Sequence, residues 1–357
     1  INVAKSFTSA VNFEHKGEVR ITASVQASAI KISCDSLVLS GSGSLQCTGG
    51  GCRIDLSVNR TITMSSSSNM LSSVIAIVAS ELGMQDSSLI STNSRGAAES
   101  ASASPEFFYQ RVSSSCTSAK RPADECECRL AAASLGVGFS SNADVQWPQG
   151  CFVHNSGANW AASVQTGSNA PAPSDGGHPF ICRTQQSVEA FAHGSDGGAC
   201  RDTTDGGGAG GGHGGDGGLG EGNTAAAGRG YGDLFYPRTA GSGGGKGFYT
   251  NAAKIPGGAG GGVIDVSLTG TLTLAAGARL QANGAAGDNG ITDTDRISAG
   301  GGGAGGSILV SASSVAGSGL IEASGGAGGL RARWYRPYYW DRYGTYGGGG
   351  GGGRVAV

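Results

Sequence analysis

Apolar and polar residues alternate along many short stretches in the first part of the chain. Ile30 and Ile32 stand on either side of Lys31, and Leu37 and Leu39 repeat the same spacing. A period of two predicts β-strands with one buried and one outward face. Similar stretches begin about every 21–23 residues between residues 19 and 95, a spacing typical of stacked repeats. Serine and threonine fill the outward positions, and Ser-Gly or Asn-Gly pairs provide the turns.

A glycine-rich block recurs almost unchanged in the second part of the chain. Residues 257–266 match residues 301–310, and the block begins a third time at 347–357. Each copy passes from a glycine run into a stretch with strand-like alternation. In such repeats each unit buries its apolar face against its neighbour. We therefore expect an all-β fold, a parallel β-helix or solenoid with polyproline II-like glycine tracts and a cysteine-rich insertion.

The patterns predict four parts. Residues 1–96 carry N-terminal solenoid strands, and residues 97–204 form a disulfide-rich insertion that prolines interrupt. Residues 205–262 are a glycine-rich segment. Residues 263–357 return to solenoid strands and hold an aromatic insert at 331–346.

Glycine accounts for 68 of the 357 residues, far above the usual share of about 7%. A glycine run can be a flexible linker, because glycine loses much entropy on ordering. It can also be an extended polyproline II-like strand that packs closely against others. The tracts recur in step with the predicted strands, which a linker has no reason to do. This regularity favours an ordered glycine layer beside the strands.

The charge balance bears on possible partners. Charged residues make up 14% of the chain, and the formal net charge is −2. This argues against nucleic acid or an anionic membrane as the main partner. No apolar run is long enough for a membrane span. The chain begins with Ile1 rather than Met, which indicates a mature chain without its signal peptide or a piece of a longer protein.

The chain has nine cysteines and no Cys-x-x-Cys pair. This usage favours disulfides in an oxidising compartment over a zinc site. Because the count is odd, one cysteine is left free or paired with another chain. The disulfide candidates are Cys34, Cys47, Cys52, Cys116, Cys126, Cys128, Cys151, Cys182 and Cys200.

Candidate catalytic chemistry is sparse. The five histidines are scattered, and no catalytic triad can be assembled from the sequence. Residues 211–219 resemble one copy of a calcium-binding nonapeptide, but that motif needs tandem copies. We therefore expect a protein that is not an enzyme, with no catalytic residue, no cofactor and no metal ligand.

Two surface features are predicted. Asn59-Arg60-Thr61 is an N-glycosylation sequon, so we expect a glycan on Asn59. The aromatic insert combines tyrosine and tryptophan with arginine, the residues that dominate interface hot spots. It either folds back over its own chain or contacts another subunit or a glycan. Its candidate contact residues are Trp334, Tyr335, Tyr338, Tyr339 and Trp340.

From Cys200 onward the chain resembles a family of secreted glycine-rich β-solenoid proteins of algae, oomycetes, protists, plants and bacteria. The resemblance rests on Cys200, residues 212–215 (Gly-His-Gly-Gly), 231–234 (Tyr-Gly-Asp-Leu), Pro237, 241–245 (Gly-Ser-Gly-Gly-Gly), 282–284 (Ala-Asn-Gly) and the closing Gly-Gly-Arg-Val-Ala-Val. It implies a secreted protein of a cell surface, cell wall or extracellular matrix, and no particular reaction.

Together these features predict an extracellular structural protein that assembles head to tail into a fibre or matrix. Its partner would be mainly itself, with glycans or other matrix proteins as further partners. The expected assembly residues at the chain ends are Ile1, Val3, Arg354, Val355 and Val357. An adhesin or glycan-binding module that uses the aromatic insert is the alternative. An ice-binding surface with Thr269, Thr271 and Thr273, and a polysaccharide-active enzyme, are more distant rivals.

Overall fold

The computed structural model describes the chain in segments. These are residues 5–6, 9–47, 52–96, 109–112, 138–140, 150–154, 157–161, 180–183, 206–221, 227–247, 255–290, 298–331 and 345–357. Regular structure within these segments is β-strand, without helix. The chain divides into two compact units, of which the first comprises residues 1–100, 192–198 and 203–357.

The first unit contains a seven-stranded and an eleven-stranded sheet, and their strand pairs are parallel. The seven-stranded sheet takes one strand from each repeat of the chain: β1 (Lys5–Ser6), β4 (Ser24–Ala27), β6 (Ser44–Cys47), β8 (Asn69–Leu71), β11 (Leu89–Ser91), β19 (Arg279–Gln281) and β22 (Leu320–Glu322).

Each repeat crosses the eleven-stranded sheet along two neighbouring columns. Column one contains β2 (Val11–Glu14), the first halves of β5 (Ala29–Leu39) and β7 (Arg53–Met64), β9 (Val74–Ala79), β17 (Val263–Leu268), β20 (Ser307–Ser311) and β23 (Arg354–Ala356). Column two contains β3 (Glu18–Ile21), the second halves of β5 and β7, β10 (Glu81–Met84), β18 (Thr271–Leu274) and β21 (Ser314–Gly317).

The core consists of apolar residues stacked from strand to strand. Ile30, Ile54, Ile75, Ile264 and Ile308 pair in register along column one. None of them is more than 1% exposed. Because the repeats place an isoleucine at the same position, parallel pairing buries a continuous row. Each such side chain contributes roughly 1.5–3 kcal/mol of burial.

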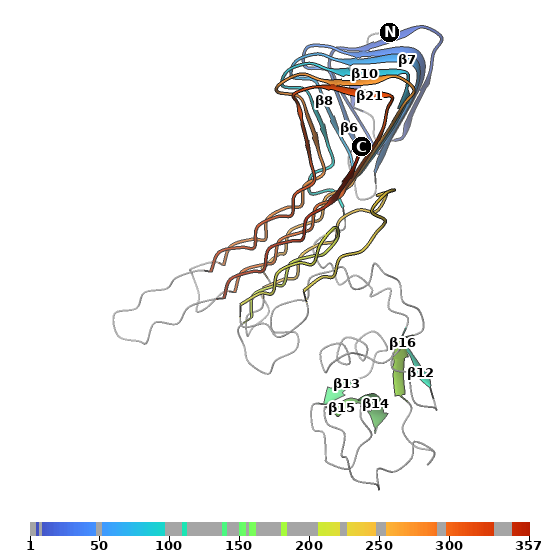
Figure 1. Ribbon diagram of the computed structural model, residues 1–357. Helices are drawn as coiled ribbons and strands as arrows, with labels where there is room; N and C mark the ends of the chain where they lie inside the picture. The colour runs from blue at the N-terminus through green and yellow to red at the C-terminus, as the bar shows by residue number, and fades with distance from the viewer. Residues whose placement is uncertain are drawn as a thin grey trace, which may run out of the picture. The chain divides into compact units, whose positions relative to one another are not determined.

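The predicted parallel β-helix or solenoid is wrong. The two sheets curl into an open half-barrel (Figure 1). In β5 and β7 one strand runs through both columns, so the eleven-stranded sheet bends; in β5 the register shifts between Cys34 and Ser36. After β11, β19 and β22 the chain leaves the sheets before it returns to column one. At these three points the chain does not pass directly from the seven-stranded to the eleven-stranded sheet.

The second unit comprises residues 101–191 and 199–202. It holds a five-stranded sheet in the order β12, β16, β14, β15, β13, with both antiparallel and parallel pairs. The strands are β12 (Tyr109–Val112), β13 (Gly138–Ser140), β14 (Gly150–His154), β15 (Gly157–Ala161) and β16 (Phe180–Arg183).

Candidate functional site

The glycine tracts of the first unit form a hydrogen-bonded bundle. Residues 299–306 lie at its centre and bond through the backbone to six other tracts. These are residues 206–212, 241–247, 255–262, 282–290, 322–330 and 345–353. In Figure 1 the tracts run away from the sheets as intertwined traces.

The central tract turns to a different neighbour at each residue and returns to the first after three. The amides of Gly300, Gly303 and Gly306 donate to carbonyls in residues 282–288. Those of Gly301 and Ala304 donate to residues 242–245, and those of Gly302 and Gly305 donate to residues 348–351. The donor–acceptor distances lie between 2.6 and 3.0 Å. A repeat of three residues per turn is that of a polyproline II helix.

The carbonyl oxygens of the central tract accept from the remaining three tracts. Gly208, Gly258 and Gly329, for example, donate to Ala299, Gly301 and Gly300. The six outer tracts also bond to one another in sequence, which closes a ring around the centre. The buried N–H and C=O groups of the central tract are therefore hydrogen-bonded inside the bundle, which compensates for their loss of contact with water.

Such close packing requires glycine. A Cβ at Gly303 would lie 2.1 Å from the Ala259 carbonyl oxygen, and one at Gly306 would lie 2.0 Å from the oxygen of Gly262. Both distances are far shorter than a carbon–oxygen contact allows. The glycine content that sets this sequence apart is thus a steric condition for the bundle.

The bundle continues directly into the sheets. Residues 255–262 lead into β17, residues 299–306 into β20 and residues 345–353 into β23. At the junction the Gly262 amide donates to Thr92, and the Ser307 amide donates to Gly262. One hydrogen-bonded body therefore extends from the stacked strands into the glycine tracts.

His213 is buried at this junction. Its Nδ1 donates to the Gly305 carbonyl at 2.8 Å, so its Nε2 accepts from the Thr239 hydroxyl at 3.0 Å. The Tyr231 ring lies 4.8 Å away, centroid to centroid. Burial, more than any other cause, lowers the pKa of His213 to about 4, and the nearby Arg354 adds to the effect. The neutral imidazole joins an outer tract to the central one.

A turn beside this junction presents apolar side chains to solvent. The Asp233 carboxylate accepts from the amides of Phe235 and Tyr236 at 2.7 and 2.8 Å. These hydrogen bonds lower the pKa of Asp233, the bond from Tyr236 most of all. Phe235 and Tyr236 are 74% and 69% exposed. An aspartate that bonds to the backbone amide two residues on is typical of such a turn. The sequence contains this aspartate, but the exposure of Phe235 and Tyr236 was not predicted.

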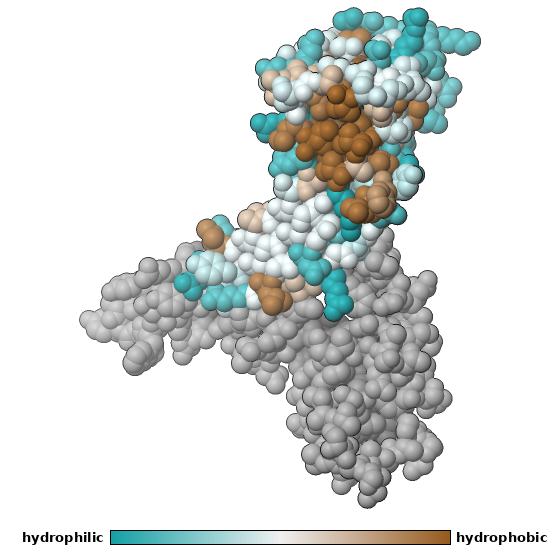
Figure 2. Space-filling model, in the orientation of Figure 1, coloured by the Kyte–Doolittle hydropathy of each residue, from teal (hydrophilic) through white to brown (hydrophobic). Residues whose placement is uncertain are grey.

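The last strands of both sheets expose apolar residues at their outer edge. In the described part of the chain β21, β22 and β23 each pair on one side only. Val355 of β23 is 44% exposed and Val357 beside it is 70% exposed. Val315 on β21 and Leu320 on β22 are also exposed. Figure 2 shows hydrophobic side chains gathered between the sheets on this face. An edge of this kind can accept a further strand.

Neither protein-family models, nor curated proteins, nor solved structures match this chain. The resemblance to secreted glycine-rich proteins accordingly stays a prediction. Across the described ranges, no three His, Cys, Asp or Glu side chains come together as a metal site. The same ranges contain no helix of the length and apolar character that crossing a membrane requires.

The predicted site residues are only partly within the described segments. Cys34, Cys47 and Cys52 are buried free thiols, so the structure does not pair these three disulfide candidates. Cys151 and Cys182 lie in β14 and β16. The remaining candidates lie outside the described residues: Cys116, Cys126, Cys128, Cys200, Ile1, Val3, Trp334, Tyr335, Tyr338, Tyr339 and Trp340.

Asn59 lies on the surface at the bend of β7. Its side chain is exposed and donates from Nδ2 to the Asp35 carboxylate at 2.8 Å. The position is open to solvent, as a glycosylated asparagine requires. Arg354 lies at the junction, where its Nε donates to the Tyr231 carbonyl at 3.0 Å. Of the expected assembly residues, Arg354 thus bonds within its own chain, and Val355 and Val357 face solvent.

Proposed function

We propose that this protein is an extracellular structural protein whose copies join end to end into a fibre or matrix. The observation that carries the proposal is the continuous hydrogen-bonded body formed by the parallel sheets and the seven glycine tracts. Each repeat is hydrogen-bonded to the repeats on either side of it, as in stacked-repeat proteins. Such a body suits a load-bearing element better than a catalytic one.

The exposed edge of the last strands supports assembly by strand addition. Val355 and Val357 are apolar and open to solvent, while the backbone of β23 has one free side within the described structure. A strand from another copy would pair with that backbone and cover the valines. Repeated contacts of this head-to-tail kind produce a filament when the ring does not close.

The extracellular setting rests on other features. Asn59 is an exposed sequon residue, and the cysteine usage and the resemblance to secreted proteins point the same way. Glycans and other matrix proteins remain further partners in this proposal. It includes neither a nucleic acid partner nor a cofactor.

Electron microscopy of Val355→Asp tests the assembly. A charge at this edge should prevent strand addition, because a carboxylate would have to be buried against the apolar row of the next copy. Val78→Asp is the matched control, since Val78 is also exposed, at 56%, but lies on β9 with a paired strand on each side. Filaments in the control and none in Val355→Asp would support the proposal. Equal filaments in both would refute the proposed edge.

A glycan-binding role is the second candidate, and the exposed turn at Phe235 and Tyr236 favours it. Aromatic rings held rigidly at a surface can stack on sugar faces, and the Asp233 hydrogen bonds fix this pair in place. Binding to a glycan array that disappears with Tyr236→Ala would support this role. A native protein that binds no glycan on the array would exclude it.

A further inference from the structure

Cys47 and Cys52 stand at the two ends of the connection from β6 to β7. Cys47 is the last residue of β6, and Cys52 comes directly before β7. Both are buried, at 0% and 6% exposure. The Sγ of Cys47 lies within 3.8 Å of the carbonyl oxygen of Arg53, the residue that follows Cys52. The two ends of the connection are thereby brought close together inside the core.

Further contacts fix both sulfur atoms in place. The Sγ of Cys47 donates to the Ser28 carbonyl at 3.2 Å and lies 3.8 Å from the Arg53 carbonyl. The Sγ of Cys52 lies 3.6 Å from the Ser72 hydroxyl, which donates to the Cys52 carbonyl at 3.0 Å. These contacts keep both sulfur atoms on the buried side of the connection.

The two thiols differ in acidity. Burial first, and then the hydrogen bond with Cys52, raises the pKa of Cys47 to about 12. Burial acts in the same direction on Cys52, but its hydrogen bonds with Cys47 and Ser72 outweigh it and lower the pKa of Cys52. Cys52 is therefore the better nucleophile of the pair, because the thiolate is the reactive form.

We propose that Cys47 and Cys52 form a disulfide when the chain folds in an oxidising compartment. The Cys52 thiolate attacks one sulfur of a protein or small-molecule disulfide, and the displaced thiolate takes up a proton. Cys47 then loses its proton and attacks the Cys52 sulfur of the mixed disulfide, which releases the second thiol. The two cysteines lose two electrons and two protons, and the oxidant becomes two thiols. The proposal rests on the proposed extracellular function in one respect only, which is the presence of this oxidant.

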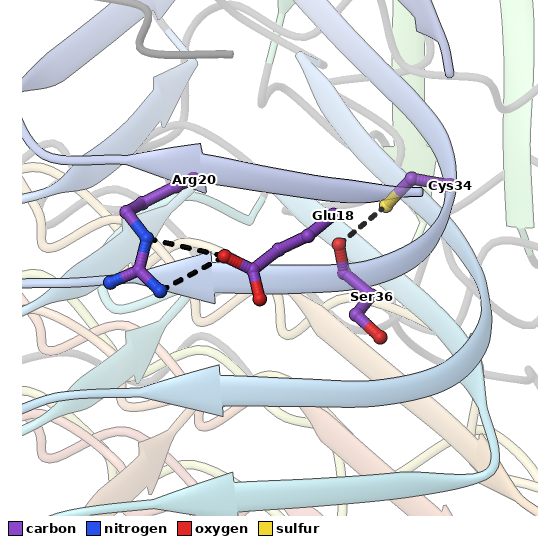
Figure 3. A network of polar contacts seen from close by, with 4 residues as sticks. All are labelled: Glu18, Arg20, Cys34 and Ser36. Atoms are coloured by element: carbon purple, nitrogen blue, oxygen red, sulfur yellow. Dashed lines mark hydrogen bonds and ion pairs between the residues drawn. The ribbon is translucent and has the colours of Figure 1, made fainter. Parts of the chain in front are cut away.

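Cys34 provides a contrast within the same unit. Its thiol donates to the Ser36 carbonyl at 3.3 Å where β5 bends, close to the ion pair of Glu18 and Arg20 (Figure 3). Burial, and then the charge of Asp35, raises the pKa of Cys34. Its sulfur thus bonds to a backbone oxygen. Cys34 should remain a thiol when Cys47 and Cys52 are oxidised.

The test compares the full chain made through a secretory pathway with the same chain made in a reducing cytosol. Each sample is unfolded in the presence of an alkylating reagent, without reductant, and its peptides are identified by mass spectrometry. We expect a Cys47–Cys52 linked peptide in the secreted chain and two alkylated cysteines in the cytosolic chain. Cys34 should be alkylated in both.

Variants decide whether the link is specific. Cys34→Ser should keep the link, and Cys47→Ser should leave Cys52 fully alkylated. Alkylation of both cysteines in the secreted wild type, or a link from either to another cysteine, would overturn the proposal. The result is independent of assembly: filaments without the link would refute this inference alone, and the link without filaments would refute only the proposed fibre.

Discussion

Replacement of Gly350 by alanine is the sharpest perturbation of the glycine bundle. Gly350 lies in the outer tract 345–353, and a Cβ there would be 2.0 Å from the Gly303 carbonyl oxygen of the central tract. An ordinary contact needs about 3.4 Å, so the two tracts must separate by more than about 1 Å. That movement would break the hydrogen bonds between them.

Three backbone bonds join these tracts, and two of them flank Gly350: Gly302 donates to Gly348 at 2.8 Å, and Gly305 donates to Gly351 at 3.0 Å. Each buried amide left without a partner costs about 1–3 kcal/mol, which gives roughly 2–6 kcal/mol for the pair. Alanine also restricts the unfolded chain, which offsets about 0.4–1 kcal/mol. We expect a net loss of about 3 kcal/mol in the free energy of opening the bundle.

Gly349→Ala is the matched control one residue away. The nearest atom to a Cβ at Gly349 is the Gly326 oxygen at 3.8 Å, an ordinary contact. This variant should be neutral or up to about 1 kcal/mol more stable than the native chain. Hydrogen exchange measured by mass spectrometry on residues 299–306 compares the two variants. A loss of about 3 kcal/mol corresponds to roughly 10²-fold faster exchange.

Equal exchange rates of residues 299–306 in Gly350→Ala and Gly349→Ala would contradict this prediction. Equal rates would mean that the outer tract does not pack on the central tract as closely as the contacts at Gly303 require. Faster exchange only at the substituted residue, with residues 299–306 unchanged, would lead to the same conclusion.

The remaining predictions concern two separate residues. The pKa of His213 is lowered to about 4 by burial, so the unfolded chain binds more protons between about pH 6.5 and pH 4. The free energy of unfolding is therefore highest above about pH 6.5 and falls by about 2 kcal/mol at pH 5. Denaturant unfolding at pH 7 and pH 5 should show this loss in the native chain and not in His213→Gln. Equal losses in both proteins would contradict the assignment to His213. Asn59→Gln should remove the mass of one N-glycan from protein made in a glycosylating host, and unchanged masses would show that the sequon is unused.

The alternation of apolar residues was sufficient to predict strands, but it did not predict how the sheets close. Ile30 and Ile54 occupy equivalent inward positions, which the period of two indicates. The curl depends on the bend between Cys34 and Ser36 and on the points where the chain leaves the sheets after β11, β19 and β22. These are relations between distant segments, and a local pattern contains no information about them.

The bundle was predictable as a layer but not as a ring of tracts. Glycine runs in step with the strands indicated an ordered layer, yet a run of identical residues does not reveal which amide meets which carbonyl. The contacts of Gly303 with Ala259 and Ala285 appear only when the tracts are packed. The role of His213 was also missed, because its partners Gly305 and Thr239 are far away in the sequence.

Electron microscopy of the native protein at moderate concentration, without denaturant, tests the central claim most directly. Each copy joined through the edges of the sheets would add the seven stacked strands of column one to the filament. At the usual strand spacing of about 4.8 Å, each copy would lengthen the filament by about 30–35 Å. We expect unbranched filaments with that axial repeat. Discrete single particles at every concentration would contradict it.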